Sequence, residues 1–266
     1  MNSTTLSLET VEARLEAGIV YVTLNRPDKR NAVNAQLLRD LVQAVQELAY
    51  RPEARVLWLS GAGPSFCAGY DVSQTANADT RSQWIASEEM AKAFAQIEAA
   101  PVVRIAQVQG HAAGAGLVLA TLCELRYATP DAVFAVPELD FGIPFSMGGM
   151  NSLTRYIGVT RTADMVLNAR RITGAQALAY GLVTDVVAPE ELAAHVQAIA
   201  EKLARRPSVL MMNTQVSLRE AALAHTPEGK NDLAALFLSR QDPACQEVSA
   251  QYAQQFRPKM KSQTPF

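Results

Sequence analysis

The sequence predicts an α/β domain made of repeated strand–strand–helix units and followed by a helical C-terminal region. Two observations support this fold class: short β-branched apolar runs alternate with segments of helical apolar spacing, and nearly all of the chain after Pro189 has helical composition. Pro207, Pro227 and Pro243 interrupt this last region. We expect a core over residues 1–200 and a helical region over residues 201–266 that serves oligomerisation and covers the site.

The first unit contains two strands, a helix and a third strand. Residues 6–15 and 19–24 predict a hairpin, because Glu16-Ala17-Gly18 supplies a turn between them. Asn34 is a candidate N-cap for the helix that follows. The apolar face of this helix is formed by Leu37, Leu38, Leu41, Val42, Val45 and Leu48. A strand at 56–59 ends in the turn cluster Gly61-Ala62-Gly63-Pro64.

The middle of the chain repeats this pattern after a polar loop over residues 73–82. A helix is expected around 84–99, and Pro101 stops it before the next strand. The elements expected after that helix are a strand at 102–108, a glycine-rich turn at 110–116, a helix at 117–123 and short strands at 125–127 and 133–135.

The last part of the predicted core is mainly helical. Helices are expected at 151–157 and 160–167, and Thr173 is expected to cap a helix over 174–179 that Gly181 ends. A strand at 183–187 closes the core.

Charge and composition exclude several classes of protein. The 266 residues carry 24 Lys and Arg against 26 Asp and Glu, a formal net charge of −2, so the basic surplus of a nucleic-acid binder is missing. Apolar residues make up 49% of the chain, which is enough for a packed core. Three widely spaced cysteines without a C-x-x-C pair favour a reducing cytoplasm. No signal peptide and no membrane span is expected from the sequence.

Three segments carry candidate chemistry: Phe66–Asp71, Gly110–Gly116 and Pro137–Pro144. The first two are glycine-rich turns that leave strands and can aim backbone amides into a cleft. Two amides that converge from separate turns would form an oxyanion hole.

These segments resemble the crotonase superfamily, the enoyl-CoA hydratase/isomerase family. Leu24-Asn25-Arg26-Pro27 with Asn31-Ala32, the Phe66–Asp71 segment, the glycine turn and Pro137-Glu138 occur in the family's order, and the resemblance covers residues 6 to about 200. It implies a spiral of ββα units and an acyl-CoA thioester substrate. It also implies oxyanion donors at the amides of Tyr70 and Ala115, with Ala68, Gly69 and Gly114 beside the thioester.

The two positions at which the family's hydratases carry glutamates distinguish hydration from isomerisation. Hydratases of the family usually carry two glutamates, and here Val118 stands in place of the first while Glu138 matches the second. Water addition typically shares its proton transfers between two carboxylates, whereas double-bond migration needs one base. The pattern favours enoyl-CoA isomerisation with Glu138 as the single acid/base, and its apolar neighbours should raise the pKa of Glu138. Asp140 could assist, but we expect a structural or loop-capping role for it. Ser146 replaces an aspartate of dienoyl isomerases and dehalogenases, which disfavours those two activities.

Basic residues are candidates for contact with coenzyme A. Arg26, Lys29 and Arg30 lie in the first loop, and Phe256, Lys259 and Lys261 lie near the C-terminus. Coenzyme A would enter as part of the substrate, so we expect no tightly bound cofactor and no metal. Related proteins form trimers or dimers of trimers, and the resemblance implies a homotrimer or homohexamer.

Other functions stay open at this stage. An enoyl-CoA hydratase or an aryl hydratase-lyase is the nearest alternative, and a family member that binds acyl-CoA, RNA or a protein with little turnover is another. A Ser-His-Asp hydrolase using His111 with Ser65 or Ser146 lacks a nucleophile elbow. A dinucleotide fingerprint lacks its third glycine, which would fall at Leu119. We expect packing for Cys67 and a structural role for Asp71.

Overall fold

A computed structural model describes residues 3–71, 73, 79–141, 144–223 and 242–247 of the chain. Contacts between residues divide the chain into two compact units, Met1–Ala204 and Arg205–Phe266. The two units are described separately below.

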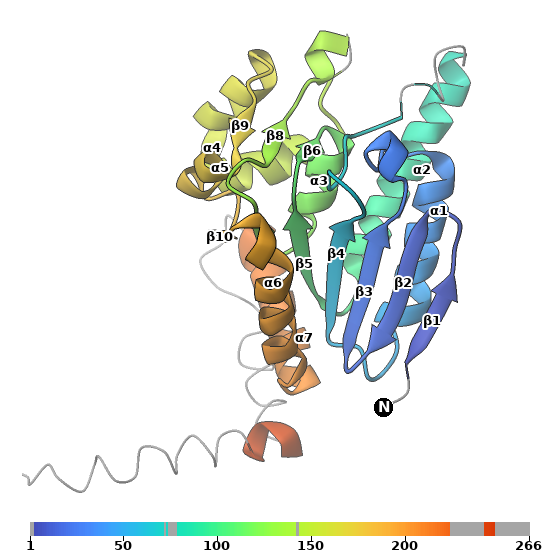
Figure 1. Ribbon diagram of the computed structural model, residues 1–266, viewed down its shortest axis with the longest axis vertical. Helices are drawn as coiled ribbons and strands as arrows, with labels where there is room; N and C mark the ends of the chain where they lie inside the picture. Colours follow the sequence, from blue (N-terminus) through green and yellow to red (C-terminus); the bar gives the residue numbers. More distant parts are fainter. Residues whose placement is uncertain (1–2, 72, 74–78, 142–143, 224–241, 248–266) are drawn as a thin grey trace, which may run out of the picture. The chain divides into compact units, whose positions relative to one another are not determined.

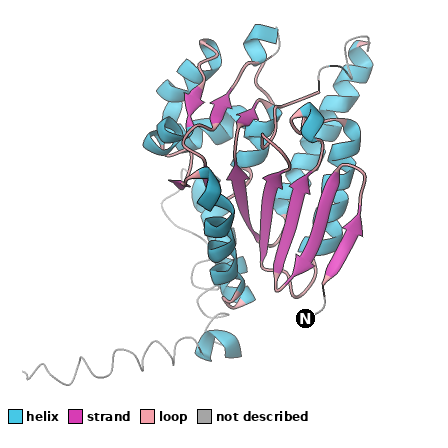
Figure 2. Ribbon diagram, in the orientation of Figure 1, coloured by secondary structure: helices cyan, strands magenta, loops and turns pink. Residues whose placement is uncertain are grey.

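The first unit is built on a seven-stranded sheet (Figures 1 and 2). In spatial order its strands are β1 (Thr4–Ser7), β2 (Val11–Glu16), β3 (Ile19–Leu24), β4 (Val56–Gly61), β5 (Val103–Val108), β7 (Leu125–Ala128) and β10 (Asp185–Val186). The first three strands are antiparallel, and every later pairing is parallel. The predicted hairpin is confirmed by β2 and β3, whereas residues 6–15, expected as one strand, are split between β1 and β2.

Helices cover both faces of this sheet (Figure 1). Val20, Val22 and Leu24 of β3 belong to the larger apolar core, which also contains α1 (Ala35–Ala44) and α2 (Thr80–Ala99). The opposite face carries Ile19 and Trp58 and packs against α6 (Pro189–Ala204). Alternate residues of one strand therefore enter different cores, as the two-residue repeat of a strand requires.

The predicted cap at Asn34 is confirmed, because its side chain accepts a hydrogen bond from the amide of Leu37. The helix continues beyond α1 as one π-helical turn, η2 (Val45–Ala49). The helix expected from Trp84 begins earlier, at Thr80, because Asp79 caps it through the amide of Ser82.

The first unit also contains a second, three-stranded sheet, which lies in the upper part of Figure 1. It consists of β6 (His111–Ala113), β8 (Val133–Ala135) and β9 (Ile172–Thr173) in the order β6-β8-β9. The sequence predicted β8, but it placed His111–Ala113 in a turn. The following helix, α3 (Ala115–Thr121), begins two residues earlier than predicted.

The remaining elements of the first unit agree with most of the predicted boundaries. A helical segment, α4 (Gly149–Leu167), is broken at Gly158, where φ is 79°, between the two helices that were predicted. Thr173 forms a capping box with Gln176 at the start of α5 (Gly174–Tyr180), and Gly181 ends that helix at a φ of 81°. The strand expected at 183–187 is only two residues long.

The second unit contains α7 (Ser208–Leu223) among its described residues.

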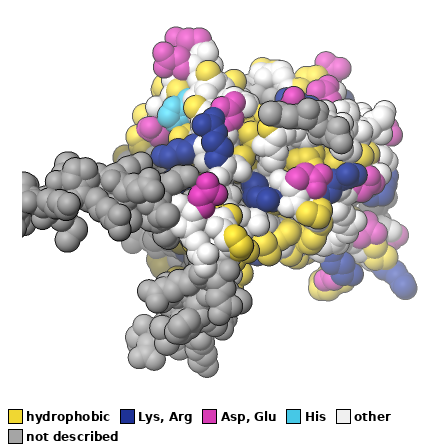
Figure 3. Space-filling model, turned by 90° about the horizontal axis from the view of Figure 1, so that it is seen from below, with side chains coloured by type: hydrophobic (Ala, Val, Ile, Leu, Met, Phe, Trp, Pro, Cys, Tyr) yellow, Lys and Arg dark blue, Asp and Glu magenta, His cyan; other side chains and the backbone are white. Residues whose placement is uncertain are grey.

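No helix in the described part of the chain has the length and apolar character needed to cross a membrane. Figure 3 shows Lys and Arg side chains interspersed with Asp and Glu on one face, as the small net charge suggests.

Candidate active site

Two glycine-containing turns meet at the end of the large sheet. The residue Cys67 forms a parallel bridge with Ala112 of β6. The amide of Cys67 donates to the carbonyl of His111 at 2.8 Å, and the amide of Ala113 donates to the carbonyl of Cys67 at 3.1 Å. These backbone bonds hold the Phe66–Asp71 segment against the start of the second turn, as the proposed site requires.

Gly69 permits a close approach between the turns. Its φ is 103°, and a Cβ at this position would lie 2.8 Å from the carbonyl oxygen of Ala113 and 3.8 Å from the amide nitrogen of Ala115. Any side chain would therefore push the turns apart. Gly116 is equally constrained, because its Cβ would lie 2.3 Å from the carbonyl oxygen of Cys67.

Ala115 is the first residue of α3. Helices leave their first amides without a carbonyl partner inside the helix, and the cap residue Gly114 offers no side chain to satisfy them. Within the described residues, no hydrogen bond occupies the Ala115 amide. This backbone donor is available for a ligand.

The backbone of Tyr70 is oriented by its pairing with Val33. The amide of Val33 donates to the carbonyl of Gly69 at 2.7 Å, and the amide of Asp71 donates to the carbonyl of Val33 at 2.9 Å. Because amides alternate in direction along an extended strand, the amide of Tyr70 points away from Val33. Gly69, the residue before it, faces Ala113 and Ala115.

The carboxyl group of Glu138 lies beside the second turn. Glu138 begins a short 3-10 helix, η4 (Glu138–Phe141). A Cβ on Gly114 would lie 2.5 Å from Oε1 of Glu138, which places this oxygen directly against the residue before Ala115. Oε2 is buried and has no hydrogen-bond partner within the described residues. Burial raises the pKa of Glu138, as the sequence predicted.

Val118 lies one turn along α3 from Ala115. Together with Phe145 and Gly149 it forms an apolar wall. The side chain of Val118 is 2% exposed, and its Cγ2 would lie 2.8 Å from a Cβ on Gly149. The same added Cβ on Gly149 would lie 2.4 Å from Cζ of the Phe145 ring. Val118, which the resemblance aligns with the first of two hydratase glutamates, is therefore packed against apolar groups.

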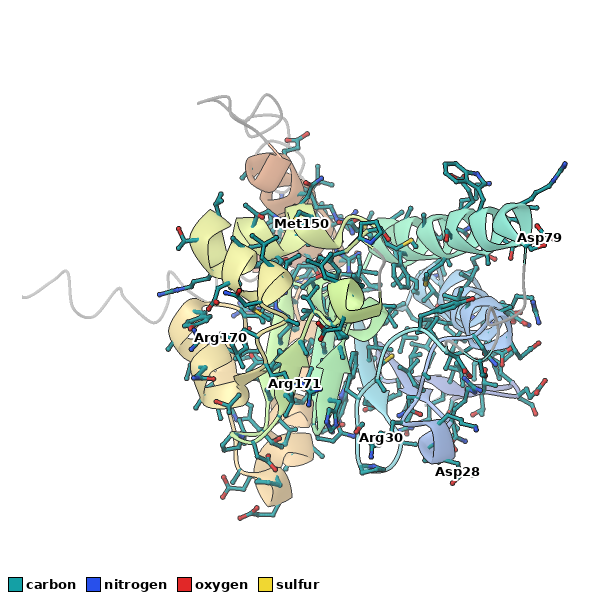
Figure 4. All side chains as sticks on the ribbon, turned by 90° about the horizontal axis from the view of Figure 1, so that it is seen from above. Asp28, Arg30, Asp79, Met150, Arg170 and Arg171 are labelled. Atoms are coloured by element: carbon teal, nitrogen blue, oxygen red, sulfur yellow. The ribbon has the colours of Figure 1, made fainter. Side chains whose placement is uncertain are left out.

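The first loop contains the other predicted site residues. Arg26 is the N-cap of η1 (Pro27–Lys29), and its guanidinium binds Asp71 at 3.0 Å as well as the carbonyl of Ala32. Asp71 has the structural role that was expected, since hydrogen bonds from the Ser73 hydroxyl and from Arg26 lower its pKa. Lys29 and Arg30 are exposed, and the carbonyl of Arg30 accepts from the amide of Ala68. Figure 4 labels Arg30 near η1 and Met150 on α4.

Asn31 organises this loop, a role that the sequence did not predict. It is fully buried at a φ of 57°, and its Nδ2 donates to the carbonyls of Ala62 and Ser65. Its Oδ1 accepts from the amide of Arg26 at 2.8 Å. The Asn31-Ala32 motif was the available signal, but the carbonyls of Ala62 and Ser65 lie more than 30 residues away in the chain.

The structure also bears on the other candidate sites: a cysteine nucleophile, a Ser-His-Asp hydrolase and a metal centre. Burial raises the pKa of the Cys67 thiol to about 12, and its Sγ contacts the carbonyl of Asn31, so Cys67 packs as expected. Ser65 Oγ lies 3.2 Å from Nδ1 of His111, but Ser65 is buried. The described residues contain no cluster of His, Cys, Asp and Glu that would hold a metal ion. Phe256 and Lys259 lie outside the described residues, as does Lys261.

Comparison with known proteins shows which family the chain belongs to. The family described as enoyl-CoA hydratase/isomerase matches residues 14–263. The chain belongs to the enoyl-CoA hydratase/isomerase family. It is similar to a 2,3-dehydroadipyl-CoA hydratase of Escherichia coli K12, with 32% identity over 203 residues that cover 76% of this chain and 79% of the relative.

Two further similarities span almost the whole chain. A peroxisomal Δ(3,5)-Δ(2,4)-dienoyl-CoA isomerase of Arabidopsis thaliana is 28% identical over 264 residues, covering 92% of this chain and 94% of the relative. A crystal structure of an enoyl-CoA hydratase subunit I from Geobacillus kaustophilus HTA426 has a TM-score of 0.87 and 27% identity, covering 97% and 98% of the two chains. The predicted crotonase-like fold is confirmed.

We predict that Gly114→Ala disables the site without unfolding the protein. The added Cβ overlaps Oε1 of Glu138 and displaces the carboxylate, and misplacing a reacting group by about 1 Å lowers rates about 100-fold. The measurement is kcat with an enoyl-CoA substrate, together with thermal unfolding. Gly158→Ala is the matched control, because Gly158 also has a positive φ but no atom lies within 4 Å of its added Cβ. Equal activity in the two variants would contradict the prediction.

A second prediction concerns stability and pH. Since burial raises the pKa of Glu138 above its unfolded-state value, ionisation of this group destabilises the fold as pH rises from about 4 through the folded pKa. Glu138→Gln should therefore unfold at a higher temperature than the wild type at pH 7, and this difference should vanish near pH 4. Asp140→Asn, which removes an exposed carboxylate two residues away, should show no such gain. A pH-independent difference between the wild type and Glu138→Gln would contradict the assignment.

Proposed function

We propose that the protein isomerises the double bond of an enoyl-CoA, with Glu138 as the single acid/base. The observation that carries this proposal is the position of Glu138, whose carboxyl oxygen lies against Gly114 while Val118 is packed in an apolar wall. One carboxylate in a partly dry environment suits a proton shuttle. Among the described residues, the nearby apolar wall of Val118, Phe145 and Gly149 offers no second base to activate water.

The proposed reaction proceeds in two proton transfers. The Glu138 carboxylate removes a proton from C2 of a 3-enoyl-CoA, and the electron pair moves into the thioester to give a dienolate. The amides of Tyr70 and Ala115 stabilise the negative oxygen, an effect of about 3–4 kcal/mol per donor. Protonated Glu138 then returns the proton to C4, which leaves a conjugated 2-enoyl-CoA and regenerates the carboxylate.

The proposed substrate contacts follow from the same geometry. Ala68, Gly69 and Gly114 border the thioester, since their turns lie beside the two amides. Exposed Lys29 is suited to the phosphates of coenzyme A. Arg26 is less suited, because its guanidinium already binds Asp71 and Ala32. Phe256 and Lys259 remain part of the proposal on the family resemblance alone.

Hydration is the second candidate. Similarity to the E. coli hydratase favours it, whereas the apolar surroundings of Val118 favour isomerisation. We predict that a panel of 3-enoyl, 2-enoyl and aryl enoyl-CoAs shows turnover of the 3-enoyl substrate alone, seen as a gain of conjugated-thioester absorbance. Loss of that absorbance with the 2-enoyl or aryl substrate would establish hydration instead. Binding without any absorbance change would indicate a family member with little turnover.

Glu138→Gln should abolish isomerisation and leave substrate binding nearly intact. The amide keeps the shape of the side chain but cannot accept the C2 proton, so we expect kcat to fall by at least about 100-fold. Asp140→Asn is the control, because it removes one negative charge from the same short helix. The measurements are kcat and the dissociation constant of a non-reactive acyl-CoA. A fully active Glu138→Gln variant would remove this residue from the mechanism.

A further inference from the structure

The C-terminal end of α3 is buried, as is every residue of this helix. Its last carbonyl groups therefore cannot be satisfied by water and need donors from the protein. The amides of Leu122 and Cys123 and the Tyr156 hydroxyl bind the carbonyls of the last turn. Two buried arginines bind the next two carbonyls, those of Leu122 and Cys123. Arg104 is 2% exposed and Arg126 is 4% exposed, and both reach the carbonyls that follow the helix.

Arg104 forms an electrically balanced contact there. Its Nε donates to the carbonyl of Leu122 at 2.7 Å, and its NH2 forms an ion pair with Glu124. Glu124 also accepts from the backbone amide of Arg104 at 2.8 Å. The positive charge of Arg104 is thus compensated by an adjacent negative charge.

Arg126 differs in its partners. Its guanidinium donates to the carbonyls of Cys123 and Leu182 and lies 3.9 Å from the ring centre of Tyr156. Within the described residues, no carboxylate lies within ion-pair distance of Arg126. A buried charge acts over a longer range than an exposed one, because solvent screens it less.

We propose that Arg126 is a positioning residue for the oxyanion hole: it fixes the segment that follows α3, and its charge, which has no ion-pair partner among the described residues, raises the positive potential at the Ala115 amide. The inference rests on the proposed function, since it assigns an oxyanion to that amide. From Ala115 to Thr121, α3 spans about 9 Å at a helical rise of 1.5 Å per residue, and the carbonyl that Arg126 binds lies two residues further on. Over about 15 Å and an effective dielectric constant of about 20, a unit charge changes the stability of an oxyanion about sixfold.

The test compares three variants that alter the charge at this end of α3. Arg126→Met removes the positive charge, Arg126→Lys keeps it, and Glu124→Gln removes a negative charge while retaining an oxygen that can accept from Arg104. The probe is 4-(dimethylamino)cinnamoyl-CoA, whose absorption shifts to longer wavelength as its thioester carbonyl is polarised. The shift at saturation reports polarisation separately from affinity and folding.

We expect the red shift of the bound probe to increase in the order Arg126→Met, wild type, Glu124→Gln. We also expect kcat with the enoyl-CoA substrate to fall about three- to sixfold from Arg126→Lys to Arg126→Met, with little change in KM. A purely structural role predicts losses in both Arg126→Met and Glu124→Gln, so any other order of red shifts overturns the inference. If Arg126→Met does not fold, Arg126→Gln, which keeps hydrogen-bond donors but not the charge, takes its place in the comparison with Arg126→Lys.

Failure of the inference can be told apart from failure of the proposed function. If the probe binds the wild-type protein without any red shift, the amides do not polarise a thioester and the oxyanion hole itself is wrong. If the wild type shifts the probe and the variants match it, only the role of Arg126 is wrong.

Discussion

The close contact between two backbone turns is the constraint on which the site depends. At Gly69 and Gly116 the neighbouring carbonyl oxygens occupy the space that a Cβ would need. Hydrogen bonds from Cys67 and Ala113 fix this contact along the backbone. The geometry of the proposed donors, the amides of Tyr70 and Ala115, is therefore determined by the main chain and not by their side chains.

Around these turns, the carboxyl group of Glu138 and a set of apolar residues occupy different places. Glu138 brings a carboxyl group to Gly114, while Val118, Phe145 and Gly149 close off the region one helical turn away. A carboxylate that is partly shielded from water is a stronger base than an exposed one, because the pKa of its conjugate acid is higher. In the function proposed above, this arrangement would favour movement of a proton over addition of water.

Local signals predicted most of the elements. The turn at Ala17-Gly18, the caps at Asn34 and Thr173, and the separation of helices 151–157 and 160–167 depend on neighbours in sequence. All four occur in the structure. β6 was missed because its three residues form a strand only by pairing with β8. The partners of Asn31, Arg26 and Arg126 were missed for a related reason. Their hydrogen bonds join segments that the chain brings together only after the sheet has formed.

The large sheet has one property that bears on how the chain reaches its fold. Its strands lie in space in the same order as in the chain, from β1 to β10, with β6, β8 and β9 set aside in the smaller sheet. Each strand therefore joins the edge left by an earlier one, and no later strand must insert between two that are already paired. During synthesis on the ribosome, the N-terminal strands can assemble before the C-terminal half has been made.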